Sequence, residues 1–219
     1  MTQAELLASV NGKIAHAARL AGRTASDVAL IAISKTYEAD AIAPLIAAGQ
    51  RRFGENRVQE ALAKWPALTE QTPGIDLHLV GQLQSNKAEE AVALFGTIHS
   101  VDRLSLVTAL AKAQDKLGKR PDCFLQVNIG DEAQKGGCPV AEVPALLTQA
   151  RGAALSVAGL MAVPPALVEP APYFALLAKM ARDHGLPGLS MGMSSDFEMA
   201  VMIGATHVRV GSALFGART

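Results

Sequence analysis

Short uncharged segments alternate with longer segments of mixed polarity along this chain. The first of them, residues 28–34 (VALIAIS), contains no charge, which is the pattern of a strand buried on both faces of a parallel sheet. Seven further strands are predicted at residues 51–56, 77–81, 97–102, 123–129, 157–163, 189–193 and 207–211, of which 51–56, 97–102 and 207–211 include charged residues. The chain is therefore expected to contain eight buried strands.

Helices are expected in the intervals between these strands, at residues 40–49, 56–65, 85–95, 103–117, 140–151, 173–184 and 195–203. Residues 1–22 predict one more helix, which begins at a possible capping box of Thr2 and Glu5. Proline cannot donate a helix hydrogen bond, so Pro66 is expected to stop the helix 56–65 and Pro44 to lie in a first turn.

Eight strand-then-helix units with short connections are what a (β/α)8 TIM barrel requires. We expect one α/β domain over residues 1–219, with an extra N-terminal helix before the barrel. An open doubly wound sheet is the alternative. It lacks support because no G-x-G-x-x-G follows the first strand, and no linker composition divides the chain.

Composition narrows the classes of partner. The chain has 20 Lys and Arg against 20 Asp and Glu and only 4% aromatic residues, which argues against nucleic acid and anionic membrane surfaces. Cys123 and Cys138 have no metal-ligand spacing, so we expect reduced thiols in a cytoplasmic protein and no metal site. Charges interrupt any signal peptide, and the uncharged stretch 152–168 is too short for a membrane span.

Lys35 follows the first strand directly, at the end of a barrel strand where active sites are built. A lysine in such a pocket can lose its proton and condense with an aldehyde as a Schiff base. The alternative is a lysine that only marks the exit of the strand into solvent.

A phosphate site is expected after the last two strands, where barrels often hold this group. Ser194 follows the seventh strand, and a capping box of Ser195 and Glu198 is expected to open a helix there. After the eighth strand, Gly211 permits close approach of an anion and Ser212 adds a hydroxyl. Each feature could also be an ordinary helix cap or turn.

Arg209 lies within the last predicted strand, two residues before Gly211, so alternation aims both to the same side. A guanidinium directed into a barrel needs a partner, because an unpaired buried charge is costly. A ring nitrogen or an acidic ligand could serve, and so could a salt bridge within the barrel.

Nine strings occur in an order that resembles the pyridoxal-phosphate homeostasis protein family: AISKT, RRFGEN, HLVGQLQSNK, SVD, LQVNI, KGG, GLMAV, SMGMSSDFE and HVRVGSALFG. The resemblance covers residues 28–216 and implies a fold-type III barrel like the N-terminal domain of alanine racemase. It also implies pyridoxal 5′-phosphate (PLP) as cofactor, with Lys35 as the Schiff-base lysine.

By the same resemblance, Ser194, Gly211 and Ser212 match the phosphate-holding positions, and Arg209 matches the arginine that faces the pyridine nitrogen. Asn56 and His78 fall in matching motifs around the pocket. His78 could equally be a hydrogen-bonded packing residue.

The function that the resemblance implies is intracellular PLP (vitamin B6) and amino-acid homeostasis without robust turnover. Alanine racemase takes an opposite-face tyrosine from a second domain, which this chain is expected to lack, and racemisation needs proton transfer on both faces. The alternatives are a PLP-dependent racemase or lyase that uses Lys35 as base, and a phosphate-binding barrel in which Lys35 condenses with a ketone. PLP-dependent apoenzymes are expected partners, and a monomer is expected.

Overall fold

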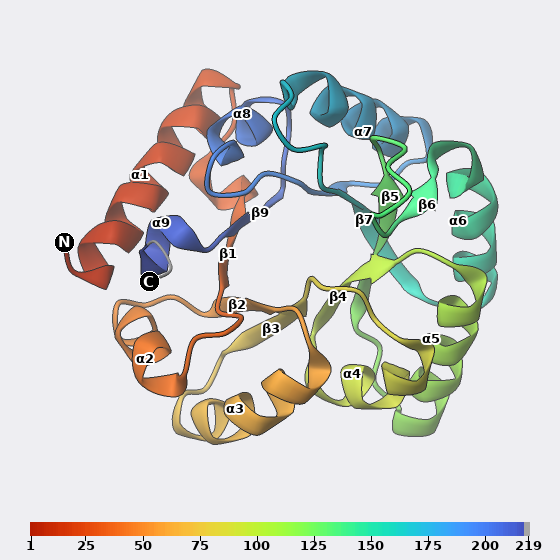
Figure 1. Cartoon of the computed structure of the whole chain (residues 1–219), viewed down its shortest axis with the longest axis horizontal. Coiled ribbons are helices and arrows are strands. Elements are labelled where there is room, and N and C mark those ends of the chain that lie inside the picture. Colours follow the sequence, from red (N-terminus) through yellow and green to blue (C-terminus); the bar gives the residue numbers. More distant parts are fainter. Residues whose placement is uncertain (217–219) are drawn as a thin grey trace.

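A computed structural model describes residues 1–216 of the chain. Eight parallel strands form a closed ring at its centre (Figure 1), because β4 pairs with β5 and joins the ends of the order β4-β3-β2-β1-β9-β8-β7-β5. They are β1 (Ala29–Ile33), β2 (Arg52–Glu55), β3 (Asp76–Leu79), β4 (Thr97–Val101), β5 (Asp122–Asn128), β7 (Ser156–Ala162), β8 (Gly188–Ser190) and β9 (His207–Val210). The expected strands and the expected barrel are confirmed.

A further short strand, β6 (Cys138–Pro139), pairs in parallel with the end of β5. Two residues are too few to leave a periodic pattern in the sequence, which is why β6 was not predicted. It lengthens the rim of the barrel on the side of the β5–α6 connection.

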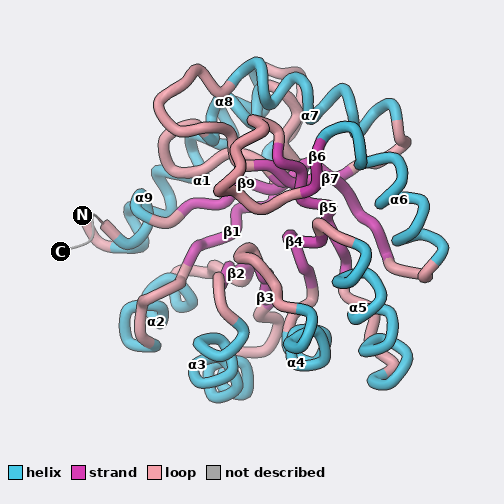
Figure 2. Tube along the Cα trace, turned by 45° about the vertical axis from the view of Figure 1, so that its right-hand side comes forward, coloured by secondary structure: helices cyan, strands magenta, loops and turns pink. Residues whose placement is uncertain are grey.

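Helices surround the strands as an outer ring (Figure 2). They are α1 (Gln3–Leu20), α2 (Ala39–Ala47), α3 (Val58–Gln71), α4 (Ala88–Leu94), α5 (Leu104–Leu117), α6 (Val143–Gly152), α7 (Ala171–Asp183), α8 (Phe197–Met202) and α9 (Ser212–Phe215). Short 3-10 turns lie at η1 (Ala25–Asp27), η2 (Ser85–Lys87) and η3 (Val140–Glu142).

Two predictions from proline were wrong. Pro66 does not stop its helix but lies inside α3, and Pro44 lies inside α2 beyond the first turn. Both helices bury an apolar face, including Trp65 of α3 and Leu45 of α2, against the sheet. Burial of such faces contributes more than the single backbone hydrogen bond that each proline removes.

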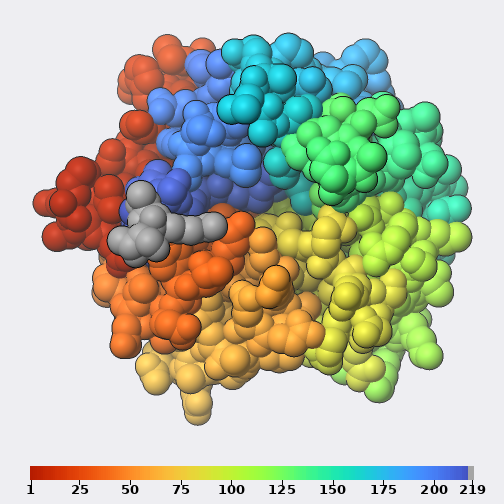
Figure 3. Space-filling model, in the orientation of Figure 1, coloured from red at the N-terminus to blue at the C-terminus, as the bar shows by residue number. Residues whose placement is uncertain are grey.

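The N-terminal helix α1 precedes the barrel and packs on its outside. The expected capping box is present, since Thr2 Oγ1 accepts from the Glu5 amide and Glu5 accepts from the Thr2 amide. Its buried residues, among them Leu7, Val10 and Ile14, face α8 and α9. Figure 3 shows the red N-terminal segment beside the blue C-terminal one on the surface. The helix therefore braces the two elements that follow β8 and β9.

The apolar core lies between the sheet and the helices, while the inside of the barrel is unusually polar. Alternate residues of each strand point to opposite faces, so in β9 Val208 and Val210 pack in the apolar core and Arg209 points inward. The buried polar side chains include His78, His99 and Ser190 from three other strands. Aliphatic layers usually fill the interior of such barrels.

No helix within residues 1–216 is both long enough and apolar enough to cross a membrane.

Candidate functional site

The carboxyl ends of the strands surround a cavity of about 590 Å³. The residues that line it come from the ends of β1 and β9 and from the segments after β1, β2, β3, β7, β8 and β9: Ile33, Lys35, Tyr37, Asn56, Val80, Val163, Met193, Ser194, Ser195, Arg209, Gly211 and Ser212. Six of the seven predicted site residues are in this set, and His78 is not. The structure therefore brings six of the predicted residues together around one cavity.

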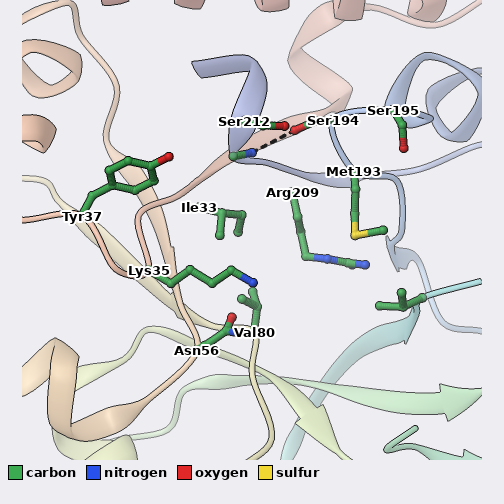
Figure 4. Close-up of a pocket in the computed structure, with 12 residues that line it drawn as sticks. Ile33, Lys35, Tyr37, Asn56, Val80, Met193, Ser194, Ser195, Arg209 and Ser212 are labelled. Atoms are coloured by element: carbon green, nitrogen blue, oxygen red, sulfur yellow. Dashed lines mark hydrogen bonds between the residues drawn. The ribbon is translucent and has the colours of Figure 1, made fainter. Parts of the chain in front are cut away.

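Lys35 enters the cavity from the β1–α2 connection. Figure 4 shows its side chain extended across the cavity floor toward Asn56 and Val80. The next residue, Thr36, has a positive φ of 65°, which turns the chain sharply away from the strand. This turn leaves Lys35 at the rim with its amine directed into the cavity.

The turn that carries Lys35 is held by a buried ion pair behind it. Lys64 Nζ of α3 contacts Glu55 Oε1 at 2.6 Å and also donates to the carbonyl oxygens of Ser34 at 2.9 Å and Tyr37 at 3.0 Å. Glu55 Oε1 accepts in addition from Ser34 Oγ and from the indole of Trp65. Both ends of the segment 34–37 are thereby fixed to helix α3.

Arg209 lies in the cavity wall opposite Lys35, with only 5% of its surface exposed. Its guanidinium donates to Ser190 Oγ at 2.7 Å and to the Ala162 carbonyl at 2.9 Å, two uncharged oxygens. Burial lowers the pKa of Arg209 to about 10, so it is still a cation at neutral pH. No carboxylate within residues 1–216 forms an ion pair with it, and the salt bridge considered from the sequence is not formed.

The predicted phosphate residues lie together at the other side of the mouth. Ser194 Oγ accepts from the Gly211 amide at 3.1 Å, which ties the loop after β8 to the loop after β9 (Figure 4). Ser212 begins the short helix α9, whose first amides have no partner within the helix. Two hydroxyls and a helix start thus face one region of the cavity.

The expected capping box of Ser195 and Glu198 is wrong. Helix α8 begins two residues later than predicted, at Phe197, and Ser195 lines the cavity instead. The carboxylate of Asp196 accepts from the Met193 amide at 2.6 Å, so it stabilises the turn before the helix. This arrangement leaves the Ser195 hydroxyl at the cavity (Figure 4).

Tyr37 is a cavity residue that sequence reasoning missed. Its ring stacks on Phe215 of α9 with 4.3 Å between ring centroids, and Figure 4 shows its hydroxyl on the side of Ser194 and Ser212. The only available signal was its position two residues after Lys35. Because the left-handed residue Thr36 intervenes, strand alternation could not have placed it.

Asn56 and His78 have different surroundings. Asn56 follows β2 and lines the cavity, and its backbone lies so close to Gly81 that a Cβ there would be 2.2 Å from the Asn56 carbonyl oxygen. His78 lies deep in the barrel, 2% exposed, and bonds to Asp76 and His99. The packing interpretation of His78 matches its location.

Comparison with known proteins places these features in a family. Residues 11–219 match the family model "Alanine racemase, N-terminal domain". The "Pyridoxal phosphate homeostasis protein" of Pseudomonas aeruginosa is 42% identical over 99% of this chain and 96% of its own length.

Solved structures of other proteins have a similar fold. The structure of PipY from Synechococcus elongatus with PLP bound is 40% identical and superposes with a TM-score of 0.84 over 98% of this chain and 100% of that chain. An alanine racemase of Clostridium difficile is only 14% identical, with a TM-score of 0.68 over 88% of this chain and 53% of that one. The latter likeness concerns the fold alone.

Proposed function

This chain belongs to the pyridoxal phosphate homeostasis protein family, with the alanine racemase N-terminal fold, and we propose that it holds PLP as a Schiff base on Lys35. In this proposal the protein buffers PLP and amino-acid balance in the cytoplasm without robust catalytic turnover. The observation that carries it is the convergence of an amine, a buried cation and a two-loop hydroxyl cluster on one cavity.

The donor set fits this cofactor group by group. PLP, when bound, supplies an aldehyde carbon that a primary amine can attack and a ring that acts as an electron sink. Lys35 offers the amine at one wall. Ser194, Ser212 and the free amides that begin α9 suit a phosphate dianion, since they are all donors.

Arg209 suits the ring nitrogen. Within residues 1–216, two of its five N–H groups donate to Ser190 and Ala162, and the guanidinium lines the cavity. A permanent donor and cation at that position favours an unprotonated ring nitrogen, which weakens the electron sink. A weak electron sink is compatible with a holding role.

The restricted set of ionisable groups supports the same conclusion. Among the residues that line the cavity, those able to move a proton or carry charge are Lys35, Tyr37 and Arg209. The Tyr37 hydroxyl is on the phosphate side rather than across the cavity from Lys35 Nζ (Figure 4). Racemisation needs a second acid–base group on the opposite face of the substrate from the lysine. We therefore expect amino-acid racemase or lyase activity, the alternative function, to be weak or absent.

The first experiment is a titration of the purified protein with PLP, followed by absorption spectroscopy, borohydride reduction and peptide mapping. We expect a pyridoxyl label on Lys35, its loss in Lys35→Ala, and no loss in Lys112→Ala, which removes an exposed lysine of α5. A label on another lysine would contradict the proposed attachment. No chromophore at all would favour the phosphate-binding barrel.

Turnover and partners need separate measurements. Exchange of the α-proton of amino acids in D₂O, abolished in Lys35→Ala, would establish the racemase or lyase alternative. Release of PLP to an apoenzyme in stoichiometric mixtures would support delivery to PLP-dependent enzymes. We expect the protein to sediment as a monomer throughout.

A further inference from the structure

We propose that Asp76, His78 and His99 are positioning residues for Arg209, linked to it through Ser190 by a hydrogen-bond chain of fixed direction through the barrel. The hydrogen-bond chain is formed by side chains of this protein alone and needs no ligand. Its consequence for ligand binding rests on the proposed function, in which Arg209 faces the ring of PLP.

The chain consists of four consecutive contacts. Arg209 Nη1 lies 2.7 Å from Ser190 Oγ, and Ser190 Oγ lies 2.9 Å from His99 Nδ1. His99 Nε2 lies 2.9 Å from His78 Nδ1, and His78 Nε2 lies 3.1 Å from Asp76 Oδ2. These residues come from β9, β8, β4 and β3, so the chain crosses the barrel interior from the cavity to the opposite rim.

The two ends of the chain determine where its protons lie. A guanidinium can only donate, so Ser190 Oγ accepts from Arg209. At the other end, the hydrogen bond from His78 lowers the pKa of Asp76, which is therefore a carboxylate and can only accept. The proton on that bond must then be on His78 Nε2.

The two rings between these ends can be ordered in two ways. With His78 neutral, its Nδ1 accepts from His99 Nε2–H, and His99 Nδ1 accepts from the Ser190 hydroxyl. Burial holds the pKa of His99 well below its ordinary value, so this ring carries a single proton. Arg209 then donates to Ser190, and Ser190 donates to His99. His99 donates to His78, and His78 donates to Asp76, so each donor has one acceptor.

The reverse order is much less favourable. It requires a doubly protonated His78 with only 2% of its surface exposed, and it requires His99 Nδ1–H to donate to Ser190. Ser190 would then accept from both neighbours and have its own proton unplaced. Within residues 1–216 its hydroxyl has side-chain bonds to His99 and Arg209 alone.

The surroundings hold the His99 ring in the orientation that the hydrogen-bond chain requires. His99 stacks on Phe124 with 4.6 Å between centroids and 5° between planes, which fixes its ring plane and both nitrogens. In the part of the chain that the structure describes, no three His, Cys, Asp or Glu residues are arranged to hold a metal ion. In the favoured order the Ser190 hydroxyl donates to His99, so its lone pairs face Arg209 and orient the guanidinium.

The direction can be measured on the apoprotein. We expect ¹⁵N NMR at neutral pH to place one proton on His99 Nε2 and to show scalar coupling across its hydrogen bond to His78 Nδ1. His78 should carry its proton on Nε2. Two results would contradict the proposed direction of the hydrogen-bond chain. One is a proton between the two rings that is bonded to His78 Nδ1, and the other is the absence of any coupling between the rings. This readout needs no PLP, so it stands whether or not the proposed function does.

The link to Arg209 is tested by variants at the far end. Asp76→Ala removes the terminal acceptor, and we expect altered His99 and Arg209 side-chain ¹⁵N signals and PLP affinity about three- to tenfold weaker. Asp76→Asn keeps an acceptor oxygen and should restore both. The matched control is Asp122→Ala, an acid that begins β5 on the same rim and bonds to Ser156 instead.

Two results would overturn the positioning role. One is unchanged Arg209 signals in Asp76→Ala, and the other is equal loss of PLP affinity in Asp76→Ala and Asp122→Ala. If wild-type protein fails to bind PLP while the NMR signals behave as expected, the proposed function fails and the chain stands.

Discussion

Gly211 lines the cavity beside the proposed phosphate residues, and the protein alone does not require a glycine there. Its φ is −116°, within the range of ordinary residues, and an added Cβ would meet Ile33 at 3.5 Å, a normal contact. If only glycine functions at position 211, the reason is therefore the space that the bound ligand needs.

We predict that Gly211→Ala leaves the fold intact and weakens PLP binding. A methyl group in the cavity displaces the phosphate from its donors, and the loss of one charged hydrogen bond costs about 1.5–3 kcal/mol. The Kd for PLP should therefore rise about tenfold or more, as measured by absorbance titration. Gly152→Ala on α6, where nothing lies within 4 Å of the added Cβ, is the control. An unchanged Kd would remove Gly211 from the phosphate site.

The sequence predicted the position of a residue in the cavity when that residue lay at the end of a predicted strand. Lys35, Arg209 and Gly211 follow from the ends of β1 and β9 together with the family motifs. His78 was harder, because a motif indicates that a residue is near a site but not how deep it lies in the barrel. Its strand begins only two residues earlier, so its side chain lies below the cavity floor.

At the scale of elements, the connection between β1 and α2 depends on α3. Lys64 of α3 holds both carbonyls that flank the Lys35 turn, and its charge is paired with the fully buried Glu55. Breaking a buried pair by removing one partner typically costs about 3–5 kcal/mol, because the other charge is left uncompensated. This clamp is what keeps a left-handed Thr36 in place.

We predict that Lys64→Met lowers the free energy of unfolding by about 3–5 kcal/mol and loosens the Lys35 turn. The Tyr37 amide, which donates to the Ser34 carbonyl, should lose protection from hydrogen exchange. Urea denaturation and exchange measured by NMR would check both. The double variant Glu55→Gln/Lys64→Met should be more stable than Lys64→Met, since it removes the unpaired charge. Strictly additive losses would contradict the coupling.

Helix α3 also tests the cost of an internal proline. Pro66 is exposed and cannot donate to the Leu62 carbonyl, so Pro66→Ala restores one helix hydrogen bond without disturbing the core. Proline is about 3 kcal/mol less favourable than alanine within a helix, and its stiffer unfolded chain offsets about 0.4–1 kcal/mol of that. We predict that Pro66→Ala raises the free energy of unfolding by about 2 kcal/mol. A decrease would show that Pro66 itself is needed for the packing of α3.

Strands were easier to predict from the sequence than helix ends. Eight predicted segments identified the eight barrel strands, and five of them contain no charge, because a strand buried on both faces admits few charges. Helix ends depend on tertiary packing, which overrode the local signal of Pro66 and moved the start of α8 from Ser195 to Phe197. The four-residue α9 was also missed, although its start forms part of the site.

At the scale of the whole molecule, the barrel interior buries several histidines in place of aliphatic layers. His207 of β9 lies edge-on to Phe124 with centroids 5.0 Å apart and contacts Thr206 through Nδ1. Burial, with His78, Arg52 and Arg209 nearby and Asp76 opposing, lowers its pKa from 6.5 to about 4. Burial likewise lowers the pKa of His99. The folded protein thus keeps these rings neutral where an unfolded chain would protonate them.

This difference makes the protein sensitive to mild acid. Below pH 6.5 the unfolded chain takes up a proton at residue 207 that the folded chain does not bind until about pH 4, so acid favours unfolding. Across that window the free energy of unfolding should fall by about 3 kcal/mol from this ring alone. Urea denaturation at pH 7, 6 and 5 should show a shallower fall in His207→Gln than in wild type, while His16→Gln, on the exposed side of α1, should follow wild type. The lowered pKa of Asp76 acts only below 3.8 and does not enter this range. Parallel curves for wild type and His207→Gln would mean that His207 gains its proton in the folded barrel as readily as in the unfolded chain.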